Sequence, residues 1–204
     1  MRRVVVTGLG TINPLGNTVD SSWNALNCSK SGISKISKFQ VDGLTCKIAG
    51  TIDDSKINEE IVSQRDRRKI DRFILLGLIA ADEALKDSGF ISDDYNNFRS
   101  GVMVGSGIGG LDTIYKNSSI LDNKGSRKIS PFFIPSSLIN LLSGQISIKY
   151  NLKGPNSSPV TACATGTHAI GDSFTLIKNN KADLMVCGGA EAAVCPLGIS
   201  GFSA

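Results

Sequence analysis

The chain has 204 residues, enough for one large domain or two small ones. Hydrophobic residues make up 41% and charged residues 20%, an ordinary globular balance that excludes wholesale disorder. A net charge of +4 is too small to indicate nucleic-acid binding by itself. No apolar run approaches the roughly 18 residues of a membrane span.

The cysteine content argues against a disulfide framework and against a metal site. The five cysteines are odd in number, none forms a C-x-x-C pair, and the chain has one histidine. The apolar run near Met1 is too short for a signal peptide. We therefore expect a reduced, soluble, cytoplasmic protein without a metal ion. The cysteines are Cys28, Cys46, Cys163, Cys187 and Cys195.

Strands are expected to alternate with helices in the first half of the chain. Residues 4–6 are typical of a buried strand that ends in a glycine turn. Thr18 is placed to cap a helix through 21–26, and a short strand is expected over 48–52. The strongest helix is predicted over 70–88. Its apolar residues recur near the helical repeat: Ile70, Phe73, Ile74, Leu78, Ala81 and Leu85.

The second half continues the alternation. Residues 102–104 are expected as a buried strand, and residues 134–150 as one apolar helix. Residues 159–162 lead into Cys163, a small-residue helix follows to Asn179, and 183–187 form a last strand. This order predicts an α/β fold with a largely parallel sheet covered on both faces.

Cys163 stands where a strand is expected to turn sharply into a helix. Its neighbours Ala162 and Ala164 are small, so the turn can hold the sulfur at the mouth of the helix. The free N–H groups and partial positive charge of a helix N-terminus favour the nucleophilic thiolate. The alternative is a small buried cysteine in a close-packed helix, which is what we expect for Cys187 and Cys195.

His168 is the obvious candidate for a base, because it is the single histidine. Five residues along a helix correspond to about 500° of rotation, or about 140° away from the face of the cysteine. We therefore expect His168 to have a structural role, so the sequence offers a nucleophile without its base.

Three pairs of motifs resemble those of the elongating β-ketoacyl-[acyl-carrier-protein] synthases. Their spacing matches over the whole chain, and the resemblance is greatest to the class II enzymes of bacterial type II fatty-acid synthesis. Thiolases have a different cysteine motif, and chain-length factors lack the cysteine. The motifs are TACATG (161–166) with HAIG (168–171), VVVTGLG (4–10) with PLG (14–16), and GGAE (188–191) with PLGISGF (196–202).

The resemblance implies a thiolase-like layered α/β/α fold and a ping-pong decarboxylative condensation. Cys163 would take an acyl group from acyl-carrier protein as a thioester, and the carbanion formed from malonyl-carrier protein would attack it. Two family histidines and a second backbone oxyanion donor belong beyond Ala204. Residues 1–204 would thus be the first of two similar halves, inactive alone. No cofactor is implied, because phosphopantetheine arrives with the carrier protein.

The glycine-rich run at residues 105–110 matches G-x-G-x-x-G and supports an alternative, an NAD-binding domain. The match is weak, because no acidic residue ends a strand about 20 residues later. A second alternative is a non-catalytic binding fragment.

In the family, this turn lines the active site. The resemblance implies that Ile108 gates the acyl pocket, that Phe202 lines it, and that Phe133 and Ile134 approach it across a homodimer interface. The alternative for these apolar residues is ordinary core.

The densest charge run lies at residues 65–72, with four basic residues spaced along one helical face. Such a stripe is typical of a surface that binds an acidic partner, but it is more commonly the solvated start of a helix. The resemblance favours docking of acyl-carrier protein, with Arg127 and Lys128 at a second docking position. No aromatic residues interleave the run, so nucleic acid is a poor alternative. The four residues are Arg65, Arg68, Lys69 and Arg72.

Overall fold

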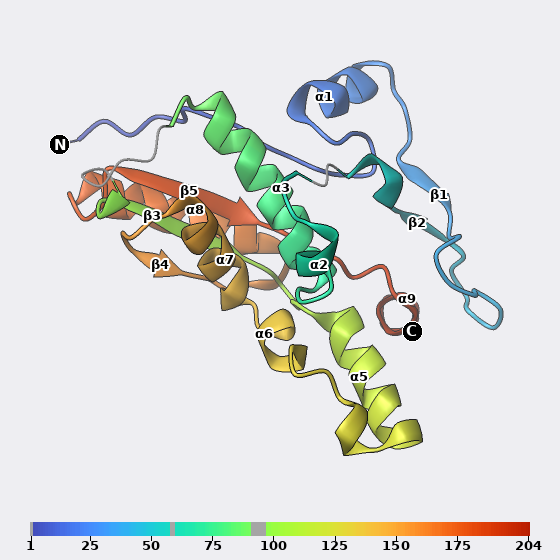
Figure 1. Cartoon of the computed structure of the whole chain (residues 1–204). Coiled ribbons are helices and arrows are strands. Elements are labelled where there is room, and N and C mark those ends of the chain that lie inside the picture. Colours follow the sequence, from blue (N-terminus) through green and yellow to red (C-terminus); the bar gives the residue numbers. More distant parts are fainter. Residues whose placement is uncertain (1, 58–59, 91–96) are drawn as a thin grey trace.

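A parallel sheet with helices on both faces forms the body of the molecule (Figure 1). The structure is a computed structural model, and it describes residues 2–57, 60–90 and 97–204. β3 lies in the middle of the three-stranded sheet and runs parallel to both neighbours. The strands are β3 (Ser100–Gly105), β4 (Asn156–Ser157) and β5 (Leu184–Gly189).

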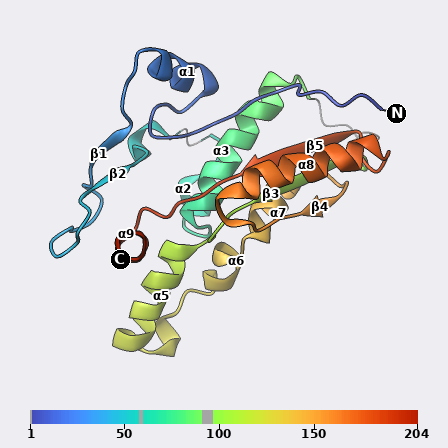
Figure 2. The same cartoon turned by 180° about the vertical axis from the view of Figure 1, so that it is seen from behind.

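Helices cover the two faces and give the molecule three layers. α8 (Thr165–Lys178) packs on β5 and β3 from one side, which Figure 2 shows in front. α7 (Asn140–Tyr150) packs on β3 from the other side, beside α3 (Arg72–Asp87). The prediction of an α/β fold with a parallel sheet covered on both faces is confirmed for the described residues.

The main core lies between the sheet and the α3–α7 layer. All six residues of β3 are buried, as expected of a central parallel strand. Phe73 and Ile74 of α3 meet Leu142 and Ile146 of α7, and all four side chains are fully buried. Burying each contributes roughly 1.5–3 kcal/mol. The helices cross closely at Gly77, where an added Cβ would lie 2.5 Å from Leu142 Cδ1.

Asp71 sets the start of α3, two residues later than the predicted Ile70. This buried carboxylate caps the helix, because its Oδ1 accepts a hydrogen bond from Phe73 N at 3.1 Å. Its Oδ2 accepts from both Thr113 N, at 3.1 Å, and Thr113 Oγ1, at 2.6 Å. Asp71 therefore ties α3 to α5 (Leu111–Lys124).

The predicted basic face along one helix is wrong. Residues 64–67 form a separate short helix, α2 (Gln64–Arg67), and the chain turns before α3 begins. Lys69 pairs with Asp66 at 2.6 Å, and Arg72 pairs with Asp54. The capping groups Ser63 and Asp71 each start a new helix, so the four basic residues share no continuous face.

The predicted strand at residues 4–6 is also wrong, and its valines are not buried. Val5 and Val6 are 56% and 77% exposed. The segment lies along α3, where Asp87 accepts a hydrogen bond from Leu9 N and Glu83 accepts one from Thr11 N. Side-chain carboxylates of α3 thus satisfy the backbone N–H groups of Leu9 and Thr11, which follow the predicted strand.

The N-terminal end of this segment is held near β5. Arg2 pairs with Asp183 at 2.6 Å, and Arg99 pairs with the same carboxylate. Hydrogen bonds from Arg99 and Arg2 lower the pKa of Asp183 to about 2. Asp183 therefore stays ionised well below neutral pH.

Smaller elements lie beside α3. α1 (Val19–Asn27) is a helix with Thr18 as its cap, as predicted. The predicted strand over 48–52 is confirmed as β2 (Ile48–Gly50), although it is shorter. Its antiparallel partner, β1 (Ile33–Lys35), and the 3-10 turn η1 (Asp54–Lys56) were not predicted, because such short elements leave little periodicity to detect.

The predicted single helix over 134–150 is broken into α6 (Phe133–Ser137) and α7. Leu138 between them is extended, with ψ 132°. The hydroxyls of Ser136 and Ser137 donate to Phe133 O, at 2.9 and 2.6 Å, and so compete with the helical ladder. The carbonyl of Ser137 accepts from Gly110 N at 3.1 Å, which anchors the break to the glycine turn.

The last elements complete the side of the molecule around α5. The turn η2 (Ser126–Lys128) follows α5. α9 (Pro196–Ser203) packs against α5 (Figure 1). Across the described ranges, every helix is too short or too polar to cross a membrane.

Candidate active site around Cys163

Cys163 is exposed on a strained turn at the start of α8. It lies in the 3-10 turn η3 (Ala162–Ala164), directly before Thr165 begins the helix. Ala162 has φ +49°, a left-handed conformation that is uncommon outside glycine. The predicted turn that holds the sulfur at the mouth of a helix is therefore present, and its strain is of the kind found at functional sites.

The Thr165 side chain stabilises this turn. Its hydroxyl accepts a hydrogen bond from Thr161 N at 2.9 Å and donates one to Ala162 O at 2.8 Å. The side chain is buried, and an added Cβ on Gly105 would lie 2.5 Å from Thr165 Cγ2. One hydroxyl thus links the N–H of Thr161 to the carbonyl of the strained residue Ala162.

Glycines let neighbouring segments approach the turn closely. An added Cβ on Gly189 would lie 3.2 Å from Gly166 Cα, so α8 closes directly on β5. An added Cβ on Gly107 would lie 3.2 Å from Ala162 Cα. The glycine turn therefore contacts the residue that precedes Cys163.

His168 is engaged with other partners. Its Nδ1 lies 3.2 Å from Thr161 Oγ1, and its Nε2 lies 3.2 Å from Asp172 Oδ2, one helical turn along α8. Both ring nitrogens are used, which agrees with the expectation that His168 is not the base of Cys163.

The glycine turn between β3 and α5 is held by a carboxylate. Glu191 Oε2 accepts from Gly107 N at 3.0 Å and from Ile108 N at 2.9 Å. In a dinucleotide-binding turn, backbone N–H groups face a phosphate. Here Glu191 occupies these donors with negative charge, which disfavours the NAD-binding alternative.

The predicted acyl-pocket residues lie on three elements that meet around this turn. Ile108 is on the turn itself, Phe133 and Ile134 are on α6, and Phe202 is on α9. The C-terminal end of α6 is bonded to the turn, and α9 packs on the helix that follows it. Ile108, Ile134 and Phe202 are 39%, 57% and 75% exposed, so they are not ordinary core residues.

The predicted docking residues form two separate groups. Arg65 and Arg68 are exposed on α2 and at its end, whereas Lys69 is half-buried and paired. Arg127 and Lys128 are exposed on η2, beyond the end of α5 (Figure 1). The structure therefore does not join the two groups into one basic stripe.

The five cysteines are free thiols in different surroundings. Cys195 is buried, as predicted, and burial raises the pKa of its thiol. The prediction that Cys187 is buried is wrong, because it lies exposed on β5, an edge strand of the described sheet. Neighbouring atoms still desolvate the Cys187 thiolate and raise the pKa of that thiol. Cys163 and Cys28 are exposed.

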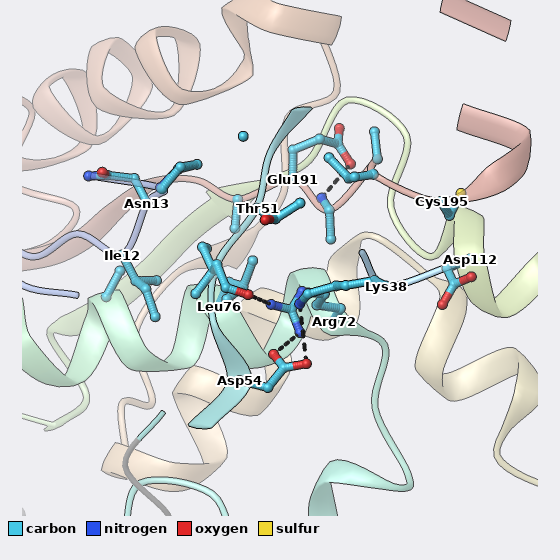
Figure 3. A pocket seen from close by; sticks show the side chains of 18 of the residues that line it. Ile12, Asn13, Lys38, Thr51, Asp54, Arg72, Leu76, Asp112, Glu191 and Cys195 are labelled. Atoms are coloured by element: carbon cyan, nitrogen blue, oxygen red, sulfur yellow. Dashed lines mark hydrogen bonds and ion pairs between the residues drawn. The ribbon is translucent and has the colours of Figure 1, made fainter. Parts of the chain in front are cut away.

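A cavity of about 710 Å³, whose lining does not include Cys163, lies between the N-terminal segment, α3 and the segment after β5 (Figure 3). Lys38 and Arg72 line it and both bind Asp54. Desolvation opposes ionisation of Asp54, but Arg72 and then Lys38 outweigh it and lower the pKa of this carboxyl. Because the lining cations, Lys116 included, are paired, this cavity gives no support for an anion site.

Comparison with known proteins identifies the family. The family model described as "Beta-ketoacyl synthase, N-terminal domain" matches residues 1–204. The chain belongs to the β-ketoacyl synthase family.

Relatives of this β-ketoacyl synthase chain have about twice its length. The 3-oxoacyl-[acyl-carrier-protein] synthase 2 of Vibrio cholerae is 47% identical over 203 residues, which cover 100% of this chain and 49% of that protein. The Rhizobium meliloti protein of the same name is 45% identical over 211 residues, covering 100% and 50%. The chain spans about half the length of the curated relatives that it matches.

Solved structures confirm the thiolase-like α/β fold. A β-ketoacyl synthase from Burkholderia phymatum matches with a TM-score of 0.82 and 25% identity, over 100% of this chain and 50% of that one. A type II PKS ketosynthase, bound to the hexaketide and in complex with its acyl-carrier protein, matches with a TM-score of 0.75 and 27% identity. That match covers 97% of this chain and 52% of the other.

Two residues of this β-ketoacyl synthase chain were missed by sequence reasoning, Thr165 and Glu191. Both lie inside motifs that the resemblance uses, but neither was given a role. A hydroxyl at the start of a predicted helix is a capping signal that could have drawn attention to Thr165. Glu191 offered a weaker signal, a single acidic residue after the two glycines that end a strand.

Proposed function

We propose that this chain provides the nucleophile of a β-ketoacyl-[acyl-carrier-protein] synthase that elongates fatty acyl groups. The observation that carries the proposal is the exposed Cys163 on a strained turn at the mouth of α8, braced by Thr165. Family membership and relatives named 3-oxoacyl-[acyl-carrier-protein] synthase 2 support the reaction type.

The chemistry is a thioester exchange followed by a decarboxylative Claisen condensation. Cys163 Sγ attacks the acyl thioester of acyl-carrier protein, and the phosphopantetheine thiol leaves. Malonyl-carrier protein then loses carbon dioxide, and its carbanion attacks the carbonyl carbon of the Cys163 thioester. The carbon–sulfur bond breaks, and Cys163 is released as thiolate. No cofactor other than the phosphopantetheine of the carrier protein takes part.

The partner is acyl-carrier protein, as in the solved ketosynthase complex. We propose that it docks on the exposed Arg65 and Arg68, with Arg127 and Lys128 as a second contact. The two histidines and the second oxyanion donor belong to a C-terminal half, which also completes the catalytic site. A homodimer and a cytoplasmic location stay predictions from the sequence.

Acylation of Cys163 tests this function directly. The chain of residues 1–204 is incubated with fatty acyl-carrier protein, and peptide mapping locates any added acyl group. In a parallel brief reaction with iodoacetamide, we expect Cys163 to be the fastest of the five thiols, since Cys195 is buried and Cys187 is desolvated.

The matched control is Cys163→Ser, which keeps the turn and removes the sulfur. It should abolish acylation without changing the circular dichroism spectrum. Acylation at Cys28 or Cys46 in place of Cys163, or faster alkylation of either thiol, would contradict the assignment of the nucleophile.

A further inference from the structure

The Glu191 carboxylate holds the middle of the glycine turn. The turn runs from Gly105, at the end of β3, to Gly110, before α5. Glu191 follows β5, and it accepts hydrogen bonds from Gly107 N at 3.0 Å, Ile108 N at 2.9 Å and Ser106 Oγ at 3.2 Å. A single side chain therefore binds three consecutive residues of the turn.

The other hydrogen bonds of the turn lie at its two ends and between Ser106 and Gly109. Ala190 N donates to Gly105 O at 3.0 Å, and Gly110 N donates to Ser137 O at 3.1 Å. The buried Ser106 hydroxyl accepts from Gly109 N at 3.1 Å. Glycine-rich backbone can adopt many conformations, so groups bound to the middle of the turn decide which one is populated. Glu191 supplies that contact for Ile108.

The position of the turn matters because it contacts the residue before the nucleophile. Gly107 lies so close to Ala162 that an added Cβ would be 3.2 Å from Ala162 Cα. Ile108 is the next residue, and its side chain is 39% exposed. Hydrogen bonds from N–H groups to a carboxylate belong to the stronger class, and two of them fix the peptide on both sides of Gly107.

We propose that Glu191 is a positioning residue that holds the turn carrying Ile108 against Ala162, the residue before Cys163, and thereby sets which acyl chain lengths reach the thiol. This inference rests on the proposed function, because it treats Cys163 as the acyl acceptor. Glu191 does not touch the reacting atoms. It acts through the turn, and removing it frees Gly107 and Ile108 to move relative to Ala162 and Cys163.

The chain contains a matched control, Glu83. Its Oε2 accepts from Thr11 N and its Oε1 from Val19 N, each at 2.8 Å. Glu83 thus performs the same chemistry, a carboxylate on two loop N–H groups, but it lies on α3 and holds the N-terminal segment. Glu83→Ala should report any general effect of losing such an anchor.

The experiment measures how the reaction rate of Cys163 depends on alkyl chain length. N-alkylmaleimides with short and long chains are reacted with wild type, Glu191→Ala and Glu83→Ala, and the ratio of long-chain to short-chain rate constants is determined. We expect Glu191→Ala to raise this ratio about tenfold, because bonds to a charged acceptor are lost. Glu83→Ala should leave the ratio at the wild-type value.

Amide hydrogen exchange at residue resolution provides the second readout. Exchange at Gly107 and Ile108 should accelerate in Glu191→Ala but not in Glu83→Ala. Glu191→Gln keeps an acceptor oxygen and should restore the ratio toward wild type. If Glu191→Ala does not fold, Glu191→Asp replaces it, since the shorter carboxylate cannot reach both N–H groups.

An unchanged ratio in Glu191→Ala, or a change equal to that in Glu83→Ala, would overturn the inference. Failure of the proposed function is a separate outcome. It would be seen in wild type as the absence of a Cys163 thioester after incubation with acyl-carrier protein, whatever the maleimide ratio of the variants.

Discussion

The Thr165 hydroxyl joins two backbone groups that flank a strained residue. It binds Thr161 N and Ala162 O, and Ala162 has φ +49°. Thr165→Val keeps the shape of the side chain and removes both hydrogen bonds. We expect a loss of about 1–3 kcal/mol in the free energy of unfolding, because two partly buried polar groups lose their partner. Cys163 should also be alkylated more slowly once its turn relaxes.

The control for this substitution is Thr175→Val, on the same helix. Thr175 donates to Gly171 O at 3.0 Å at an exposed position, so its loss should change stability little. Thr165→Ser should keep the wild-type alkylation rate. Urea denaturation and alkylation kinetics are the two measurements, and equal behaviour of Thr165→Val and Thr175→Val would contradict a role for Thr165 in the turn.

The sequence predicted individual residues well where the signal was local. The position of Cys163 at a helix mouth and the engagement of His168 with other partners both involve residues within one or two helical turns. Glu191 was missed because it acts on Ile108, which is 83 residues earlier in the chain. Cys187 was assigned to the core because apolar neighbours along a strand do not show whether that strand lies at a sheet edge.

At the scale of elements, the predictions were correct where helical periodicity was strong or a strand was buried. α3, α8, β3 and β5 lie within a few residues of their predicted positions. α5 was missed because its outer face is polar, with Asn117 as its one buried residue. The strand at residues 4–6 was wrong because strand propensity does not reveal whether a pairing strand is available, and the residues that follow it are bound by side chains of α3.

The basic residues of α2 give a prediction about partner binding. Reversing the charges in the double variant Arg65→Glu/Arg68→Glu should weaken binding of acyl-carrier protein, and most strongly at low ionic strength. Both side chains are exposed, so screening by salt removes their attraction to an acidic partner. The measurement is a dissociation constant at several salt concentrations.

Lys30→Glu/Lys35→Glu is the matched control, because it changes the net charge by the same amount on the exposed α1–β1 side. A loss of affinity as large as that of the α2 variant would mean that net charge alone attracts the carrier protein. Unchanged affinity of the α2 variant at low salt would place the docking surface elsewhere.

The whole molecule exposes several large apolar side chains in separate regions. Val6, Ile148 and Phe202 are 75–77% exposed, and Ile170 on the outer side of α8 is 55% exposed. Exposed apolar surface favours association when its members are contiguous. The chain also spans about half the length of its curated relatives. The length comparison supports the proposal that a second half completes the enzyme.

The last prediction is that residues 1–204 do not condense acyl and malonyl groups, although Cys163 accepts an acyl group. Condensation needs donors that stabilise the carbanion and the tetrahedral oxyanion, and losing one such donor costs about 10²–10³ in rate. The single histidine, His168, binds Thr161 and Asp172 instead of reaching the thiol.

The test measures carbon dioxide release from malonyl-carrier protein after Cys163 has been acylated, with the full-length synthase as the positive control. Circular dichroism first establishes that the 204-residue chain is folded. We expect an acyl-enzyme that forms slowly, with no turnover above that of Cys163→Ser. The nucleophile for acylation is present, whereas we propose that the donors for carbanion formation belong to the C-terminal half. Turnover near that of the full-length enzyme would show that residues 1–204 hold every group the reaction needs, and the assignment of the decarboxylation machinery to a C-terminal half would then be wrong.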